Sequence, residues 1–234
     1  MQHRHIFRMT YYENIQTFIR DGFVSSKNRM PLQRCFQTSY ANIVQRRNST
    51  QFFTPCGNSV NDFVPFYFSP LTKMAYTIHI GNVRLVNPFG QDLRIAEMQD
   101  LVFLVCDVEK IADQNLHFWF SDVACNTLSQ IPNYNNELNA IDKHVDWTVF
   151  DDNPMKAAIP EIGYRGVCRW QHDTDAHPNR ASKRMAEFLV KDFLPLGVIE
   201  CIVTKREEIK QQLENWLATS DHNIPVYTNN GCYF

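Results

Sequence analysis

Glu187 is an acidic residue in an apolar segment, and such a position could serve a chemical role. It lies in residues 183–190, where apolar and polar side chains alternate as in a β-strand, so it shares one face with Met185 and Leu189. A carboxylate between apolar neighbours costs free energy unless it has a partner or a function. Taken by itself, such a glutamate is more often a surface residue at the edge of a strand than a catalyst.

Basic residues are concentrated at the start of the chain. Residues 1–50 carry eight Lys and Arg against Glu13 and Asp21, although the net charge of the chain is only −2. A local positive field in a protein that is not basic overall suits a phosphate-bearing ligand or a short nucleic-acid strand better than long duplex DNA. An ordinary solvated basic face explains the same count.

The elements near this basic segment predict where an anion would bind. Residues 5–10 alternate like a strand, and Thr10 followed by Glu13 predicts a capping box for a helix over residues 11–20, which Gly22 would end. Arg8 and Thr10 would then lie at a strand end beside a helix N-terminus. Free backbone N–H groups and the helix dipole favour anions at such a place.

The remaining pattern predicts one mixed domain. Residues 26–62 form a long polar loop with one helical turn near residues 40–47, and loops of this length are usually functional. Residues 122–180 form a polar, irregular insertion with short helices. Buried strands are predicted at residues 63–68, 101–105, 116–121, 198–203 and 224–227, and helices at 71–79, 109–114 and 208–217, the last with a capping box of Thr204 and Glu207.

Composition narrows the class of protein further. With 234 residues, 44% of them hydrophobic, the chain is long enough for one sizeable core and one domain over residues 1–234. The first thirty residues hold no continuous apolar stretch, so we expect a cytoplasmic protein without a membrane segment. Its seven cysteines include no CxxC pair, which predicts reduced thiols and no metal site.

Five ordered blocks of sequence resemble the DarT family of DNA ADP-ribosyltransferase toxins, which act in toxin–antitoxin systems. They follow one another over nearly the whole chain, in the order expected for that family. The blocks are Ile6-Phe7-Arg8-Met9-Thr10 with Glu13-Asn14-Ile15, Tyr40-Ala41-Asn42-Ile43 with Arg46-Arg47, Asp62-Phe63-Val64-Pro65-Phe66-Tyr67-Phe68-Ser69-Pro70 with Met74 and Tyr76, residues 118–122, and Lys183-Arg184-Met185-Ala186-Glu187-Phe188-Leu189-Val190.

The resemblance implies an α+β, ADP-ribosyltransferase fold: a split, strongly bent β-sheet with flanking helices that holds NAD⁺, the co-substrate, in its cleft. It assigns the catalytic carboxylate to Glu187 and the catalytic arginine to Arg47. A carboxylate can stabilise the oxocarbenium-like ribose left by nicotinamide and then take a proton from the attacking base. A guanidinium stays charged at neutral pH, so it positions rather than accepts protons.

The resemblance also implies cofactor contacts, and the sequence departs from the family at two of them. NAD⁺ contacts fall on Arg8, Met9, Thr10, Thr17 and Ser25, together with Arg47. Arg8 stands where the family commonly has histidine, which adds a fixed charge for a phosphate or ribose. Thymine-modifying members have a basic residue and a histidine where this chain has Val123 and Ala124. The base is therefore thymine or guanine, with a lean towards guanine.

The insertion at residues 122–180 matches the substrate-recognition loop of the family. Trp147 and Trp170 could stack an unpaired base of single-stranded DNA, beside Arg46 as a further DNA contact. Simple packing of the loop onto the sheet is the more frequent role of such tryptophans, and it explains each of the two.

Two other functions fit the same sequence. The acceptor could be protein or RNA, because a fold does not fix its substrate. A silent NAD- or nucleic-acid-binding module is the other, although the presence of both Arg47 and Glu187 argues against silence. The resemblance further implies that modified DNA blocks replication, and that a macrodomain-type or related ADP-ribosyl-hydrolysing antitoxin is the partner.

Overall fold

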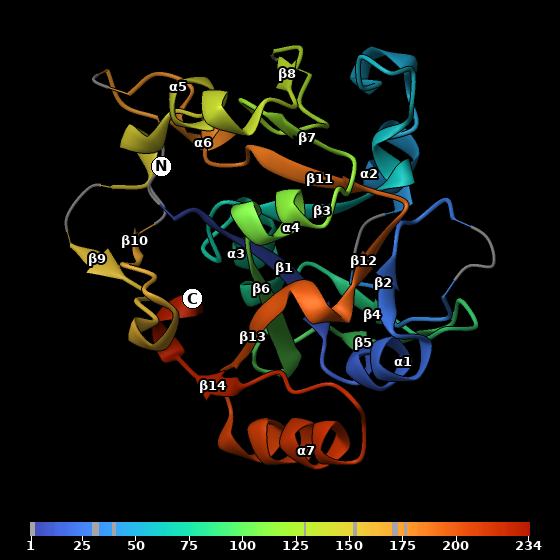
Figure 1. Cartoon of the computed structure of the whole chain (residues 1–234). Helices are drawn as coiled ribbons and strands as arrows, with labels where there is room; N and C mark the ends of the chain where they lie inside the picture. Colours follow the sequence, from blue (N-terminus) through green and yellow to red (C-terminus); the bar gives the residue numbers. More distant parts are fainter. Residues whose placement is uncertain are drawn as a thin grey trace.

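An eight-stranded mixed sheet forms the centre of the protein (Figure 1). The structure is a computed structural model, and it describes residues 3–29, 33–38, 41–128, 130–151, 154–169, 173–175 and 177–234. In spatial order the strands are β14 (Val226–Thr228), β13 (Ile199–Thr204), β6 (Leu101–Asp107), β1 (His5–Tyr11), β3 (Phe63–Tyr67), β11 (Glu187–Lys191), β7 (Phe118–Ser121) and β8 (Tyr134–Asn135).

The sheet is split between β1 and β3. On one side, β1 pairs with β6 along its whole length, from His5 opposite Asp107 to Tyr11 opposite Leu101. On the other side it meets β3 at a single register pair, Phe7 opposite Tyr67. The two halves of the sheet therefore diverge on either side of this point, as the predicted split sheet requires.

Shorter elements surround this sheet. Three two-stranded sheets join β2 (Phe23–Ser25) with β12 (Phe193–Pro195), β4 (Arg84–Val86) with β5 (Asp92–Ile95), and β9 (Met155–Lys156) with β10 (Val167–Cys168). The helices are α1 (Asn14–Asp21), α2 (Ala41–Arg46), α3 (Lys73–His79), α4 (Val108–Asp113), α5 (Ile141–His144), α6 (Arg180–Lys183) and α7 (Glu207–Ala218). In Figure 1, α7 lies beyond β14 and α2 lies near β11.

The core follows from the apolar runs of the central strands. Every residue of β6 is buried, which fits a strand covered on both faces. Ile209, Leu213 and Leu217 form the buried stripe of α7, as the helical spacing predicts. Gly22 ends α1 with a left-handed φ of 76°.

Both predicted capping boxes are wrong. Strand β1 continues through Thr10, whose hydroxyl accepts a hydrogen bond from Asn14 Nδ2, and α1 has Glu13 at its N-cap without a side-chain cap. The hydroxyl of Thr204 accepts from the backbone N–H of Arg206, which is itself the N-cap of α7. In each case another donor takes the hydroxyl that the sequence pattern assigns to the helix N-terminus.

The predicted strand at residues 183–190 begins later than expected. Residues 180–183 form α6, and β11 begins at Glu187. Met185 is therefore not on a strand, and Glu187 is the first residue after the turn. Among the described residues, no helix has the length and apolarity needed to cross a membrane.

Candidate active site

Glu187 and Arg47 form a buried ion pair. The side chain of Glu187 is fully buried and that of Arg47 is 10% exposed. Nη1 of Arg47 donates to Oε1 of Glu187 at 2.9 Å, and Nη2 donates to Oε2 at 2.6 Å. This bidentate geometry is the strongest arrangement of a guanidinium on a carboxylate.

Neighbouring strands fix the position of the glutamate. Oε1 of Glu187 also accepts the backbone N–H of Cys125 at 3.0 Å. The backbone N–H of Glu187 donates to Oγ of Ser121 at 3.0 Å, and this hydroxyl donates to the carbonyl of Val123 at 2.7 Å. The end of β7 and the beginning of the insertion therefore hold both the main chain and the carboxylate of Glu187.

The segment after α2 holds Arg47. Its backbone N–H donates to the carbonyl of Ile43, and its carbonyl accepts from Oγ of Ser59. The side-chain amide of Asn61 donates to the carbonyl of Val44 at 2.7 Å, which ties α2 to the loop before β3. These bonds place the guanidinium opposite a strand that lies 140 residues further along the chain.

The ion pair controls the charge states nearby. Burial opposes the charge on Arg47, but the Glu187 carboxylate outweighs it and raises the pKa of Arg47. Burial and the Glu187 charge raise the pKa of the Tyr67 hydroxyl and of the Cys125 thiol. Both groups are therefore neutral at physiological pH, and Cys125 is not a thiolate nucleophile.

A cavity of about 280 Å³ opens beside this pair. Arg47 forms part of its wall, and Glu187 lies directly behind Arg47. The lining residues come mainly from β1, β2, β3 and the loop between β2 and β3. They are Arg8, Met9, Thr10, Tyr11, Asn14, Phe18, Ser25, Ser26, Lys27, Gln33, Cys35, Phe36, Gln37, Thr38, Ile43, Val44, Arg47, Val60, Asn61, Phe63, Pro65, Tyr67 and Met74.

The cavity wall is cationic. Among the described residues that line it, Arg8, Lys27 and Arg47 carry charge and none is acidic. Nη1 of Arg8 donates to the carbonyl of Pro65 at 3.1 Å, whereas its Nε is buried without a hydrogen-bond partner. Burial, with a smaller effect from neighbouring arginines, lowers the pKa of Arg8 and of Lys27. Such a site gains free energy when an anion enters.

Five of the six residues predicted to contact the cofactor line this cavity, and they are Arg8, Met9, Thr10, Ser25 and Arg47. The sixth, Thr17, is half-buried on α1 and is not among the lining residues. Their roles as NAD⁺ contacts stay predictions. Lys27 and Tyr67 also line the cavity, but the sequence analysis did not predict them as cofactor contacts. The positive charge of Lys27 within a long polar loop could have indicated such a role.

The predicted DNA contacts lie elsewhere. Trp147 and Phe68 line a second cavity of about 390 Å³. Tyr67, the residue before Phe68, lines the Arg47 cavity instead. The Arg4 guanidinium lies 3.6 Å from the centre of the Trp147 ring. Arg46 is half-buried at the end of α2, and Trp170 lies outside the described residues. Their contact with DNA stays a prediction.

Metal ligands are not gathered at this site. Two groups of described residues could hold a metal ion by their geometry, and neither includes a residue that lines the Arg47 cavity.

The chain resembles known proteins over nearly its whole length. A family model described as "ssDNA thymidine ADP-ribosyltransferase, DarT" matches residues 7–234. A DNA ADP-ribosyl transferase of Escherichia coli O127:H6 is 23% identical over 98% of this chain and 93% of its own length.

Solved structures share the fold. The DarT of Thermus sp. 2.9 in complex with ADP-ribosylated ssDNA has a TM-score of 0.79 and 21% identity, over 99% of this chain and 96% of that one. The same protein in complex with NAD⁺ has a TM-score of 0.72 and 20% identity, over 100% and 99% of the two chains. The predicted ADP-ribosyltransferase fold is thereby confirmed.

Proposed function

Because the chain belongs to the DarT family of single-stranded-DNA ADP-ribosyltransferases, we propose that Glu187 and Arg47 carry the transfer of ADP-ribose from NAD⁺ to a DNA base. The buried pair that these two residues form on the wall of a cationic cavity is the observation that supports this assignment. It brings a carboxylate to the edge of a site that attracts anions.

The cavity suits the charge of a dinucleotide. NAD⁺ carries two phosphates, and the unpartnered Nε of Arg8 together with Lys27 offers donors to them. The related Thermus sp. 2.9 protein was solved with NAD⁺. We assign the pyrophosphate to the Arg8 side of the cavity and the nicotinamide ribose to the Arg47 side.

The reaction follows from this placement. The bond between ribose C1′ and the nicotinamide nitrogen breaks, and its electron pair leaves with nicotinamide. The carboxylate of Glu187 stabilises the positive charge that develops on the ribose. A ring or exocyclic nitrogen of the target base then attacks C1′, and its proton passes to Glu187. Arg47 keeps its own proton and orients the donor.

The ion pair has to open for this reaction. Arg47 and Cys125 together occupy both carboxylate oxygens of Glu187. A ribose hydroxyl that bonds to Glu187 must displace one guanidinium nitrogen. A hydroxyl oxygen of the same ribose offers the displaced guanidinium nitrogen a replacement acceptor, so donor binding and release of the carboxylate are coupled.

The target base is thymine or guanine, with a lean towards guanine. Val123 and Ala124 stand where thymine-modifying members have a basic residue and a histidine, and both are buried here. Their apolar side chains donate no hydrogen bonds, so neither side chain can donate a hydrogen bond to a base at these two positions.

Oligonucleotides of single-base composition test the proposal. The protein is incubated with NAD⁺ and each oligonucleotide, and mass spectrometry records the addition of an ADP-ribosyl unit. We expect modification of one base only and none with Glu187→Ala. Label from NAD⁺ that appears on protein or RNA instead of DNA would assign a different acceptor, and no transfer to any acceptor would refute the proposed chemistry.

The biological setting follows from the family. We assign the protein a toxin role in which modified bases block replication, restrained by a macrodomain-type or related antitoxin that removes ADP-ribose. Its seven free cysteines fit a reducing compartment such as the cytoplasm. Growth arrest on expression, relieved by Glu187→Ala, is the expected result. Equal growth arrest by both forms would contradict it.

A further inference from the structure

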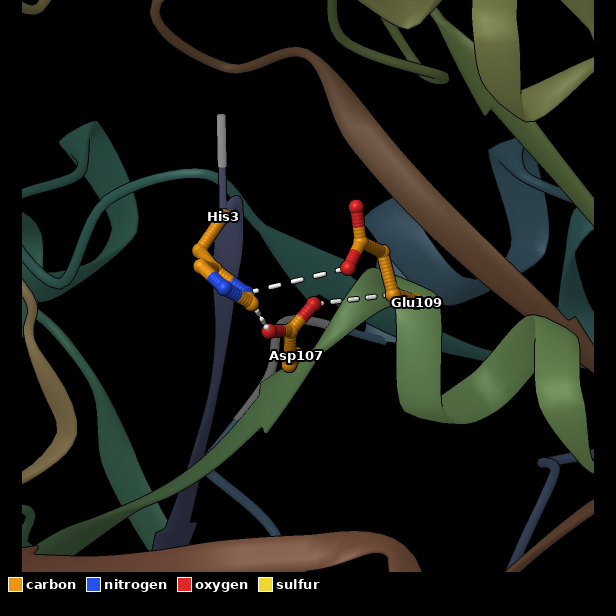
Figure 2. A group of neighbouring side chains, drawn as sticks. All are labelled: His3, Asp107 and Glu109. Atoms are coloured by element: carbon orange, nitrogen blue, oxygen red, sulfur yellow. Dashed lines mark hydrogen bonds and ion pairs between the residues drawn. The ribbon is translucent and has the colours of Figure 1, made fainter. Parts of the chain in front are cut away.

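A second group of polar side chains lies at the ends of three neighbouring strands, away from the Arg47 cavity. It comprises two imidazoles and three carboxylates, from His3, His5, Asp107, Glu109 and Glu200, and we call it the strand-end cluster. His5 and Asp107 face each other as a cross-strand pair of β1 and β6. Figure 2 shows how His3, Asp107 and Glu109 converge where β6 passes into α4.

The spacing of these atoms is that of ligands around one ion. Nδ1 of His3 lies 2.8 Å from Oδ2 of Asp107 and 3.7 Å from Oε2 of Glu109 (Figure 2). Tetrahedral bonds of about 2.0–2.1 Å to zinc place neighbouring ligand atoms roughly 3.3 Å apart. The ligand atoms of His3, Asp107 and Glu109 all lie within 4.8 Å of one another, as do those of His5, Asp107 and Glu200.

A buried oxygen without a hydrogen bond points into the same cluster. Nε2 of the buried His5 lies 3.0 Å from Oε2 of Glu200, but this oxygen accepts no hydrogen bond. The other oxygen of Glu200 pairs with Nζ of Lys110 at 2.6 Å. Without a protonated imidazole this buried acceptor has no hydrogen bond, which is costly, and it lies close enough to Nε2 of His5 for both atoms to bind one cation.

The net negative charge of the cluster also favours binding of a cation. Three carboxylates face one ammonium, that of Lys110, which leaves two negative charges when both imidazoles are neutral. A hydrogen bond and the charge of Asp107 raise the pKa of His3. Protons and a metal ion would therefore compete for this imidazole, because a ligating histidine has to be neutral.

We propose that His3, Asp107 and Glu109 of the strand-end cluster bind one first-row divalent transition-metal ion of the zinc class. Imidazole and carboxylate ligands suit such an ion, and no cysteine takes part. The ion is structural: it fastens the residues before β1 to the beginning of α4. No member of the cluster lines the Arg47 cavity, so the ion lies apart from the proposed NAD⁺ site, whereas His3 and His5 line the second cavity together with Trp147.

Zinc chloride added to the metal-free, tag-free protein with reduced thiols tests the site. Calorimetry should record one equivalent bound, and at a hundredfold excess over Kd the Tm should rise by roughly 5–11 °C. The double variant His3→Ala/Glu109→Gln should lose the Tm shift. Both side chains are exposed, at 73% and 37%, so the variant is expected to fold. Binding should weaken as the pH falls from 8 to 6.

Glu208→Gln is the matched control. Like Glu109, Glu208 lies in the first turn of its helix, but it is far from the cluster in sequence and contacts Arg206. It should keep the full Tm shift. No binding by the wild type, or an equal shift in wild type and the His3/Glu109 double variant, would overturn the proposal, and the latter result would place the zinc on other groups, either His5 with Asp107 and Glu200 or the cysteines. Neither result bears on the transferase reaction.

Discussion

Replacing Glu187 with glutamine tests whether the buried pair serves both the fold and the reaction. The substitution keeps the shape of the side chain but removes its charge and turns one acceptor into a donor that faces Nη2 or Nη1 of Arg47. Breaking a buried ion pair by neutralising one partner costs about 3–5 kcal/mol. For a domain of this size each kcal/mol lowers the Tm by roughly 2–4 °C, so we expect a fall on the order of 10 °C.

Activity should fall separately from stability. Loss of a single group that stabilises transition-state charge costs about a hundredfold to a thousandfold in kcat. Single-turnover transfer to an oligonucleotide, measured well below the Tm of the variant, isolates this effect from unfolding. Circular dichroism of the same samples gives the Tm.

A double variant separates the two roles. In Arg47→Met/Glu187→Gln no charge is left unpaired, and neutral replacements of a buried pair are often as stable as the pair itself. We expect the Tm to return to within about 3 °C of the wild type while activity stays lost. Glu208→Gln, in an exposed pair, controls for the substitution and should change the Tm by less than about 1 °C. An unchanged Tm in Glu187→Gln, or recovered activity in the double variant, would refute the reasoning.

Three further outcomes follow from the structure. Arg8→Met should raise the KM for NAD⁺ about tenfold to a hundredfold, because charged hydrogen bonds are worth about 1.5–3 kcal/mol, and an unchanged KM would remove Arg8 from the donor site. Burial opposes ionisation of Glu200, but its imidazole and ammonium neighbours lower the pKa of this carboxyl. The folded state therefore binds fewer protons than the unfolded state, and stability from this group is present above about pH 4.5 and lost at lower pH. In thermal melts, Lys110→Met should thus be less stable than wild type near neutral pH and converge with it below about pH 4. Gly166→Ala should lower the Tm by roughly 5 °C, because φ is +98° and the new Cβ would lie 2.2 Å from the carbonyl oxygen of Lys156; KM for NAD⁺ should not change.

The long apolar runs predicted their strands because burial on both faces leaves a strong signal. β3, β6 and β13 lie where the sequence placed them. The short strands β2 and β12, three residues each, were missed because so few residues carry no readable period and form a strand only by pairing with each other. Their pairing is a tertiary effect that a local pattern does not contain.

The Arg47 and Glu187 pair shows the same limit at the site. Nothing local connects two residues that are 140 positions apart, so only the resemblance to a family brought them together before the structure did. The expected strand alternation around Glu187 was itself wrong at Met185, because a turn precedes β11. By itself the sequence pattern favoured a surface position for Glu187, whereas the structure buries its carboxylate against the guanidinium of Arg47.

The split between β1 and β3 explains why the cavity lies where it does. After the single pair Phe7 opposite Tyr67, residues 8–10 of β1 and Pro65 of β3 no longer pair with each other, and they line the opening instead. Pro65 has no N–H to offer, and its carbonyl would remain unpaired on this side. Nη1 of Arg8 donates to that carbonyl across the gap, in place of a backbone N–H. Arg8 therefore provides a hydrogen bond to the Pro65 carbonyl at the edge of the split, while its Nε has no protein partner and can donate to a ligand. Histidine, with its shorter side chain and no permanent charge, would not combine these two roles at neutral pH.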